Sequence, residues 1–153
     1  MKKRGTDPIV ANLPLREVHL VDTSAWSKAR NDAHLLEVFD ESARGGLVAT
    51  CDVVCLELLR SARNRDRFMV QSRLLSTLPQ CPIGRREQTR AREVQVELAA
   101  AGHHRGVKPV DLLIAAAAEA AQLPVLHYDH DYDIIAAITG QPSRWLAAPG
   151  ALP

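Results

Sequence analysis

Four acidic residues lie in four separate parts of the chain, two of them at the end of a short apolar run, one at the start of a helical stretch and one in the second turn of a helical stretch. They are Asp22, Glu57, Asp111 and Asp129. Asp22 directly follows the β-prone run 18–21, and Asp129 directly follows the run 123–128. In an open parallel sheet, ligands bind beyond the carboxyl ends of the strands. The sequence therefore predicts that carboxylates from distant segments meet at one edge of one sheet.

A cluster of carboxylates favours a bound divalent cation. Like charges a few ångström apart raise each other's pKa until some of the groups become protonated. Hard oxygen ligands select Mg²⁺, and Mn²⁺ can take its place. Such a cation lowers the pKa of a bound water and stabilises a leaving oxygen, which is the chemistry of phosphodiester hydrolysis. Helix capping and solvated acids stay open as alternatives, because the chain contains eighteen acidic residues.

The acids differ in how well an ordinary role explains them. Asp22 could simply cap the helix that follows it, and so could Asp111, since the helix dipole favours an anion at that end. Glu57 interrupts an otherwise apolar stretch, so it is less readily explained as a solvent-exposed residue without a specific role. Three acids stand at alternate positions after the last apolar run, namely Asp129, Asp131 and Asp133. We expect at least one of them to face solvent.

The elements that position these acids alternate between strands and helices. Short apolar runs stop at capping residues before stretches of helical periodicity, as strands do when they leave a parallel sheet. The fold class is therefore α/β, with a short central parallel sheet flanked by helices on both faces. The expected strands cover residues 18–21, 47–51 and 123–128, with an added edge strand at 145–146. The expected helices cover residues 29–43, 52–63, 66–78, 86–101, 110–122 and 132–138.

Length and composition describe one globular domain. The chain has 153 residues and a mass of 16.8 kDa, which is the usual size of a single domain. No apolar run approaches the ~20 residues that span a bilayer, so we expect no membrane association. Residues 1–17 contain Gly5, Pro8 and Pro14 without sustained periodicity. We expect them to form a flexible leader before a single domain over residues 18–153.

Several other kinds of site are excluded. The three cysteines cannot all pair with one another and lack the C-x₂-C doublets of zinc sites, so we expect free thiols in a reducing cytoplasm. The histidines at positions 103, 104, 127 and 130 match no zinc spacing, and we expect His127 to be a hydrogen-bonded core residue. The chain has no G-x-S-x-G and no glycine-rich phosphate loop, which argues against acyl hydrolases and P-loop enzymes.

Basic residues are concentrated in one third of the chain, although the formal net charge is only +1. Nine arginines lie between residues 60 and 92, opposed there only by Asp66 and Glu87, so this region is strongly basic and the remainder acidic. An acidic cleft beside an arginine-rich region suits a metal-dependent enzyme that acts on a polyanion. A solvated helical face or a surface for an acidic protein partner explains the same arginines. The side chains proposed to contact RNA or a partner are Arg60, Arg85 and Arg86.

Four blocks of sequence, taken together, resemble the PIN-domain ribonucleases, and most closely the VapC toxins of bacterial toxin–antitoxin pairs. The resemblance runs from about residue 18 to residue 140, and the third and fourth blocks are the specific ones. The blocks are Val21-Asp22-Thr23-Ser24-Ala25-Trp26, Glu57 within Leu-Glu-Leu-Leu, the segment 107–116 (Val-Lys-Pro-Val-Asp-Leu-Leu-Ile-Ala-Ala), and the segment 126–136 (Leu-His-Tyr-Asp-His-Asp-Tyr-Asp-Ile-Ile-Ala).

The resemblance implies a PIN-like fold and a role for each matching residue. It implies that the Mg²⁺ or Mn²⁺ site is formed by Asp22, Glu57, Asp111 and Asp129. Asp131 would be an auxiliary acid, and the hydroxyls of Thr23 and Ser24 would orient the first aspartate. The implied reaction is hydrolysis of an RNA phosphodiester bond by activated water, without a covalent enzyme intermediate.

The resemblance also implies partners. A small VapB-like antitoxin would hold the toxin inactive by filling its cleft, and the complex would bind its own promoter DNA through the antitoxin. Family members commonly form homodimers, which would place two acidic clefts along one groove. The leader before the first strand is longer than the family usually shows.

Three other functions fit parts of the pattern. A PIN nuclease of RNA processing would share the fold and the metal without a toxin role. A phosphoacceptor receiver domain needs paired acids after its first strand and a lysine after its last, whereas here Asp22 is followed by Thr23-Ser24 and the last strand ends at Asp129. An inactive binding module would be a folded protein that holds no metal, and the presence of all four acids argues against it.

Overall fold

A computed structural model describes residues 12–153 of the chain. Within these residues the chain forms a four-stranded parallel sheet and seven helices. The strands are β1 (His19–Val21), β2 (Val48–Ala49), β3 (Val125–His127) and β4 (Ser143–Trp145). The helices are α1 (Thr23–Arg30), α2 (Ala33–Arg44), α3 (Asp52–Arg60), α4 (Arg65–Ser76), α5 (Arg85–Ala100), α6 (Pro109–Ala120) and α7 (Asp131–Thr139). This is the α/β architecture that the sequence predicts.

The sheet has the strand order β2-β1-β3-β4, and every neighbouring pair is parallel. Leu20 in β1 pairs with Ala49 on one side and Val125 on the other. All residues of β1 and β3 are buried, as expected for a parallel sheet covered on both faces. The chain leaves β1 toward β2 and later returns to β1's other side. This reversal creates a crevice at the carboxyl ends of β1 and β3.

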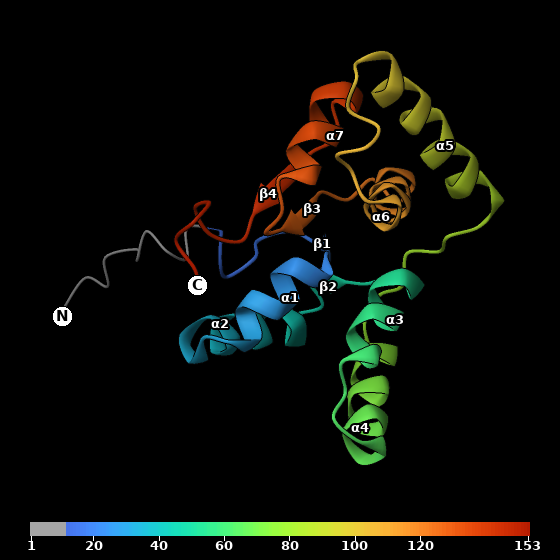
Figure 1. The fold of residues 1–153 in the computed structure, drawn as a ribbon. Helices are drawn as coiled ribbons and strands as arrows, with labels where there is room; N and C mark the ends of the chain where they lie inside the picture. The colour runs from blue at the N-terminus through green and yellow to red at the C-terminus, as the bar shows by residue number, and fades with distance from the viewer. Residues whose placement is uncertain (1–11) are drawn as a thin grey trace.

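Helices cover both sides of the sheet (Figure 1). α1 and α2 lie on one side, α6 and α7 lie on the other, and α5 packs on the outside of α6. α6 is apolar almost all round because it is enclosed by β1, α5 and α7. Its four consecutive alanines, residues 115–118, are all buried, and alanine both favours a helix and allows close packing of its neighbours. The close packing of α6 against its neighbours therefore holds the residues at its amino end in a defined position.

α3 and α4 form a helical pair that projects from the body of the molecule in Figure 1. α3 follows β2, so its first turns lie close to the carboxyl edge of the sheet, and it contacts α1 and α6. The large apolar side chains that this pair exposes are Leu56, Phe68, Met69, Val70 and Leu74. Such a patch commonly marks a protein-binding surface.

The predicted helix over residues 29–43 is wrong in one respect, because two helices, α1 and α2, occupy this part of the chain. The carboxylate of Asp32 accepts hydrogen bonds from the backbone N–H groups of His34 (3.0 Å) and Leu35 (2.9 Å). A capped new amino terminus of this kind starts a second helix at an angle to the first. Periodicity alone did not separate them, since the apolar spacing continues across the break.

The boundary of the expected leader requires correction. Residues 1–11 lie outside the described part of the chain, but residues 12–17 are described and pack against the domain. Leu13 and Leu15 are buried in the hydrophobic core. The backbone N–H of Leu15 donates to the hydroxyl of Ser42 on α2 (3.0 Å). The folded domain therefore begins before residue 18, because these two leucines pack into its core. The glycine and proline residues of the segment do not indicate this burial.

Two further expectations about the core and the cysteines are confirmed. His127 is fully buried in β3, and its Nδ1 accepts a hydrogen bond from the backbone N–H of Asp129 (3.2 Å). Burial lowers the pKa of this histidine, so it is neutral at physiological pH. All three cysteines are free thiols. None of the helices formed by residues 12–153 combines the length and the apolar character that crossing a bilayer requires.

Candidate metal centre

Asp22 is the residue at which β1 passes into α1. Its backbone N–H continues the sheet ladder by donating to the carbonyl of Leu126 on β3 (2.9 Å). Its carboxylate caps α1 by accepting from the backbone N–H of Ser24 (3.0 Å) and also accepts from the Ser24 hydroxyl. The hydroxyl of Tyr132 on α7 donates to its other oxygen (2.7 Å). Three donors thus hold a buried carboxylate in one orientation.

The two hydroxyl residues after Asp22 serve different acids. Ser24 orients Asp22, as the sequence predicts, and its hydroxyl also accepts from the backbone N–H of Tyr128 (2.9 Å). Thr23 differs from the prediction, because its hydroxyl donates to Oε1 of Glu57 (3.1 Å) rather than to Asp22. Glu57 lies half-buried on α3 and faces α1 at this point. The acid of α3 is therefore tied to the start of α1.

Asp111 is the third residue of α6. The helix begins at Pro109, whose fixed φ suits the first helical position, and no side chain caps its amino end. Capping therefore does not explain Asp111. Its side chain is buried, and its Oδ2 oxygen has no hydrogen-bond donor.

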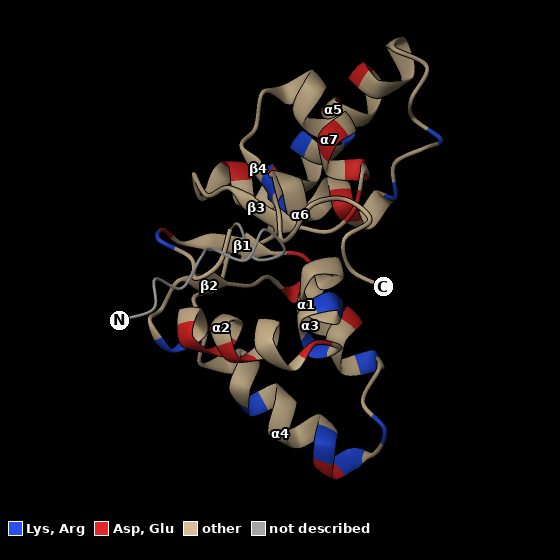
Figure 2. Ribbon diagram, turned by 90° about the vertical axis from the view of Figure 1, so that its left-hand side faces the viewer, with Lys and Arg blue, Asp and Glu red and all other residues tan. Residues whose placement is uncertain are grey.

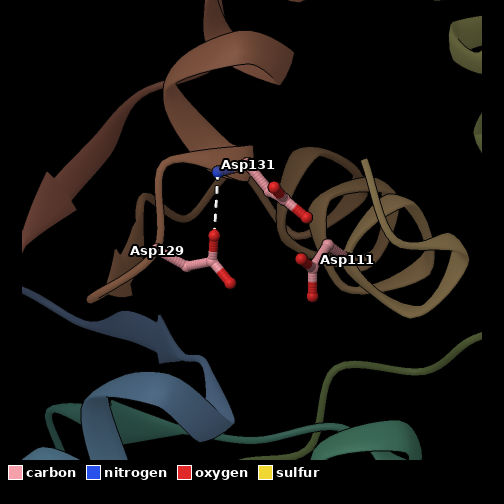
Figure 3. Close-up of side chains that lie close together, drawn as sticks. All are labelled: Asp111, Asp129 and Asp131. Carbon is pink, nitrogen blue, oxygen red and sulfur yellow. Dashed lines mark hydrogen bonds between the residues drawn. The ribbon is translucent and has the colours of Figure 1, made fainter. Parts of the chain in front are cut away.

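Asp129 and Asp131 stand between β3 and the start of α7, facing Asp111 across the crevice (Figure 3). One carboxylate oxygen from each of the three residues lies within 4.8 Å of the other two. The backbone N–H of Asp131 donates to Oδ1 of Asp129 (3.0 Å), which fixes the relative position of the two. We call Asp111, Asp129 and Asp131 the acidic triad. Asp131, predicted as an auxiliary acid, is a full member of this group.

The remaining two predicted acids, Asp22 and Glu57, lie outside this triad. Asp22 is linked to it through Tyr132, the neighbour of Asp131, and its negative charge acts on Asp111. Glu57 is linked to Asp22's helix through Thr23. Of the predicted acids, the structure thus brings together the three residues of the acidic triad, whereas Glu57 contacts Thr23 and is not part of this group.

A lysine side chain lies among the three acids. The Nζ of Lys108 is 2.7 Å from Oδ2 of Asp129, 2.9 Å from Oδ2 of Asp131 and 3.2 Å from Oδ2 of Asp111. The first two contacts are hydrogen bonds. The third is an ion pair without hydrogen-bond geometry, which is why Oδ2 of Asp111 still lacks a donor. The backbone N–H of Lys108 also donates to Asp131 (3.0 Å).

The acids of the triad differ in how easily they ionise. Burial raises the pKa of Asp111 to about 8, and the neighbouring Asp131 and the charge of Asp22 add to the rise. Burial also acts to raise the pKa of Asp131, but the hydrogen bonds from Lys108 outweigh it and hold that pKa below its ordinary value. The positive charge of Lys108 acts in the opposite sense on the pKa of Asp111 but does not offset the effect of burial.

The donor set fits a divalent cation that prefers oxygen. Three carboxylates converge from two segments, the start of α6 and the connection between β3 and α7, and one of their oxygens is buried without a hydrogen-bond donor. Mg²⁺ and Mn²⁺ take carboxylate oxygens and keep several waters. Among the described residues, no other group of three acids, histidines or cysteines is this close together.

Sequence reasoning did not identify Tyr132 and Lys108. Tyr132 had a recognisable signal, because a buried tyrosine normally needs a hydrogen-bond partner and this one lies between two aspartates. For Lys108 the sequence offered only a weak indication of a role at the site, namely a positive charge directly before the helix whose first turn contains Pro109 and Asp111. Its contacts with residues 129 and 131 depend on the approach of α6 to α7, which the sequence does not show.

The predicted arginine contacts divide between two places. Arg60 is exposed at the end of α3, one helical turn beyond Glu57, and the basic residues of the α3–α4 pair continue to its free end (Figure 2). Arg85 and Arg86 instead line a 760 Å³ surface cavity with Glu119 of α6. Glu119 lies eight residues beyond Asp111, roughly 12 Å along the helix. The structure thus places Arg60 on the same helix as Glu57 and leaves Arg85 and Arg86 beside Glu119 of α6.

Comparison with known proteins identifies the family. Residues 19–138 match the PIN domain family. Ribonuclease VapC18 of Mycobacterium tuberculosis is 42% identical over 137 residues, which covers 88% of this chain and 99% of that protein. Ribonuclease VapC21 of the same species is also 42% identical over 135 residues, covering 86% and 96% of the two chains.

A solved structure supports the same assignment of the fold. The crystal structure of VapBC2 from Rickettsia felis, bound to a DNA fragment from its promoter, matches with a TM-score of 0.66 and 16% identity, covering 84% of this chain and 98% of that one. The chain belongs to the PIN-domain family and, within it, to the VapC ribonucleases. The acidic triad lies inside the matched region.

Proposed function

We propose that this protein is the endoribonuclease toxin of a VapBC-type toxin–antitoxin pair, and that it hydrolyses RNA phosphodiester bonds with the help of a divalent cation. Membership of the VapC ribonucleases supports the class of reaction. The observation that carries the proposal is the convergence of Asp111, Asp129 and Asp131 within 4.8 Å at the carboxyl edge of the sheet.

The acidic triad would hold the cation, Mg²⁺ in the cell with Mn²⁺ able to replace it, and Asp22 and Glu57 would complete the negative surface around it. When bound, such a cation lowers the pKa of a water for attack on phosphorus and stabilises the leaving oxygen. The side chains of the site hold the acids in place for this. Ser24 and Tyr132 orient Asp22, Thr23 orients Glu57, and the backbone of Asp131 orients Asp129.

RNA would approach along the α3 side of the crevice. Arg60 is exposed one turn beyond Glu57, so its guanidinium can bind a phosphate next to the one that is cut. Arg85 and Arg86 lie by the far end of α6, and we assign them to a more distant part of the RNA or to a protein partner. Because exposed phosphate contacts weaken with salt, the salt dependence of RNA binding by variants at these arginines distinguishes a contact with RNA from a contact with a protein partner.

A VapB-like antitoxin is the proposed partner. The structural neighbour from Rickettsia felis is a VapBC complex bound to promoter DNA, and we propose that this protein reaches promoter DNA only through such an antitoxin. The exposed apolar side chains of α3 and α4 offer a surface for it. We also propose a homodimer, and a cytoplasmic location in which the three free thiols stay reduced.

Controlled expression in a bacterial host tests the toxin role. We expect the parent chain to arrest growth and Asp111→Asn to leave growth unaffected, with RNA from the parent culture showing new 5′ ends. Co-expression of the gene adjacent to this one should restore growth if it encodes the antitoxin. RNA cleavage without growth arrest would favour a nuclease of RNA processing. Absence of cleavage by soluble, metal-loaded protein on total RNA would favour an inactive binding module.

A further inference from the structure

We propose that Lys108 is the resident counter-cation of the acidic triad and competes with the divalent cation for the same carboxylates, so that this lysine sets how tightly the protein holds metal. The inference rests on the proposed function, because it assumes that the triad is the metal site. It assigns a separate role to a residue outside the set of acids.

The contacts of Lys108 are with all three acids of the triad. Its Nζ lies 2.7 Å, 2.9 Å and 3.2 Å from Oδ2 of Asp129, Asp131 and Asp111. No other lysine or arginine within residues 12–153 forms an ion pair with any of the three. Lys28, the only other lysine in this part of the chain, lies over the ring of Tyr128 at 5.1 Å.

The ammonium group and a divalent cation exclude each other at this place. Mg²⁺ binds carboxylate oxygens at about 2.0–2.1 Å, and the ammonium group contacts an oxygen of each of the same three residues. Two cations between the same carboxylates would repel each other strongly at such short range. Loading the metal therefore requires the lysine side chain to leave.

The backbone around Lys108 is fixed, but its side chain is free to leave. The backbone N–H donates to Oδ2 of Asp131 (3.0 Å), and the extended ψ of 138° is the conformation that a following proline favours. The side chain is 55% exposed, so solvent is available beyond the carboxylates. Rotation about side-chain bonds is enough for the exchange, and no helix has to move.

The size of the effect follows from this exposure. Ion pairs of half-exposed lysines contribute modestly to stability, and the divalent cation carries twice the charge. We therefore expect removal of the ammonium group to lower the Kd for Mn²⁺ by about five- to tenfold, rather than by several orders of magnitude.

Calorimetric titration of Mn²⁺ into the full chain, without antitoxin, tests the inference. The parent is compared with Lys108→Met, which keeps the length and apolar stem but removes the charge, and with Lys108→Arg, which keeps the charge and offers a forked donor to carboxylates. Lys28→Met is the matched control for loss of a lysine. We expect Lys108→Met to bind about five- to tenfold more tightly than the parent, Lys108→Arg to bind no more tightly, and Lys28→Met to match the parent.

The outcomes separate this inference from the proposed function. A parent that binds Mn²⁺ with a Kd that Lys108→Met leaves unchanged or weakens would overturn the role of Lys108 while keeping the metal site. A parent that binds no Mn²⁺ would overturn the metal site and the inference together. If Lys108→Met does not fold, Lys108→Arg still decides, because tighter binding by that variant contradicts competition.

Discussion

Tyr132 and Asp22 form the buried hydrogen bond that joins α7 to the end of β1. Tyr132 is 1% exposed, and its hydroxyl lies 2.7 Å from Oδ1 of Asp22. Burial and the negative charges of Asp22 and Asp111 keep the pKa of this phenol well above its ordinary value, so the hydroxyl is protonated and donates at neutral pH. The orientation of Asp22 therefore depends on a side chain that belongs to a different element.

Tyr132→Phe removes this donor and leaves the ring in place. We expect the free energy of unfolding to fall by about 1–3 kcal/mol, because a buried carboxylate oxygen loses its partner, and RNA cleavage to fall by about ten- to a hundredfold through misplacement of Asp22. Tyr128→Phe is the control, since that hydroxyl binds the backbone of Ala148 and Leu152 instead. Thermal melts and cleavage assays check both variants, and equal cleavage by Tyr132→Phe and the parent would refute the positioning role.

Asp111 gives the metal-free protein an unusual dependence on pH. In the folded chain its pKa is about 8, whereas an unfolded aspartate has a pKa of about 3.9. The folded state therefore binds this proton more tightly than the unfolded state, so the contribution of Asp111 to stability falls as pH rises between these two values. Asp131, with its lowered pKa, acts in the opposite sense, but its contribution is lost only in acid, below its ordinary pKa.

Asp111→Asn should consequently gain stability relative to the parent as pH rises. In the presence of a chelator, we expect Asp111→Asn to become more stable relative to the parent as pH rises from 5 to 8. The difference in unfolding free energy between the two chains should change by at most about 1.4 kcal/mol per pH unit, and their melting temperatures should change in the same sense. Melting curves of both chains at four pH values measure this. A difference that stays constant across the range would show that Asp111 ionises normally.

At the scale of elements, α7 carries Asp131 and Tyr132 in its first turn and ends at Gly140. Gly140 adopts a left-handed conformation with φ 71°, which favours glycine at the end of a helix. α2 also ends at a glycine, but Gly45 has φ −75°, which any residue adopts. The two helix ends form a natural comparison.

Gly140→Ala should lower the free energy of unfolding by about 1 kcal/mol because the added Cβ strains the left-handed backbone. A loss of this size lowers the melting temperature by about 2–4 °C in a chain of this length. Gly45→Ala should be nearly neutral, since its added Cβ would meet nothing closer than 3.5 Å. Equal losses in the two variants would show that backbone conformation is not the cause.

The order of strands and helices was predictable because apolar runs, capping residues and glycine ends act locally. The break at Asp32 and the burial of Leu13 and Leu15 were not predictable, because both depend on packing against distant elements. The same distinction applies to the site. Strand-end logic located Asp22 and Asp129, whereas the contacts of Lys108 and Tyr132 form only when α6 and α7 pack beside β1.

At the scale of the whole molecule, most of the arginines lie on the α3–α4 pair and on α5, where acidic residues are interspersed with them (Figure 2). Only Arg60 of the three proposed contacts lies on the element that carries an acid of the site, Glu57. Arg90 is already engaged by Glu119 at 2.8 Å, so the α5 group is partly neutralised from within. This arrangement favours Arg60 as the contact nearest the cut phosphate.

Arg60→Glu should weaken RNA binding more than Arg86→Glu does, and its effect should shrink as salt rises because exposed charges are screened. We expect a loss of about tenfold or more at low ionic strength. Binding of a catalytically inactive Asp111→Asn background to labelled RNA, at two salt concentrations, measures both. A larger loss for Arg86→Glu would place the main RNA path along α5 instead.

Asp111, Asp129 and Asp131 are proposed to form a divalent-cation site, on which the whole proposed function depends. The most direct measurement is Mn²⁺ binding by calorimetry to the parent, Asp111→Asn and Asp133→Asn. Asp133 is a nearby exposed acid whose carboxylate binds Trp145 and His130 and lies outside the triad. We predict binding by the parent and by Asp133→Asn, and loss of binding by Asp111→Asn with the fold intact. Undiminished binding by folded Asp111→Asn would contradict the claim.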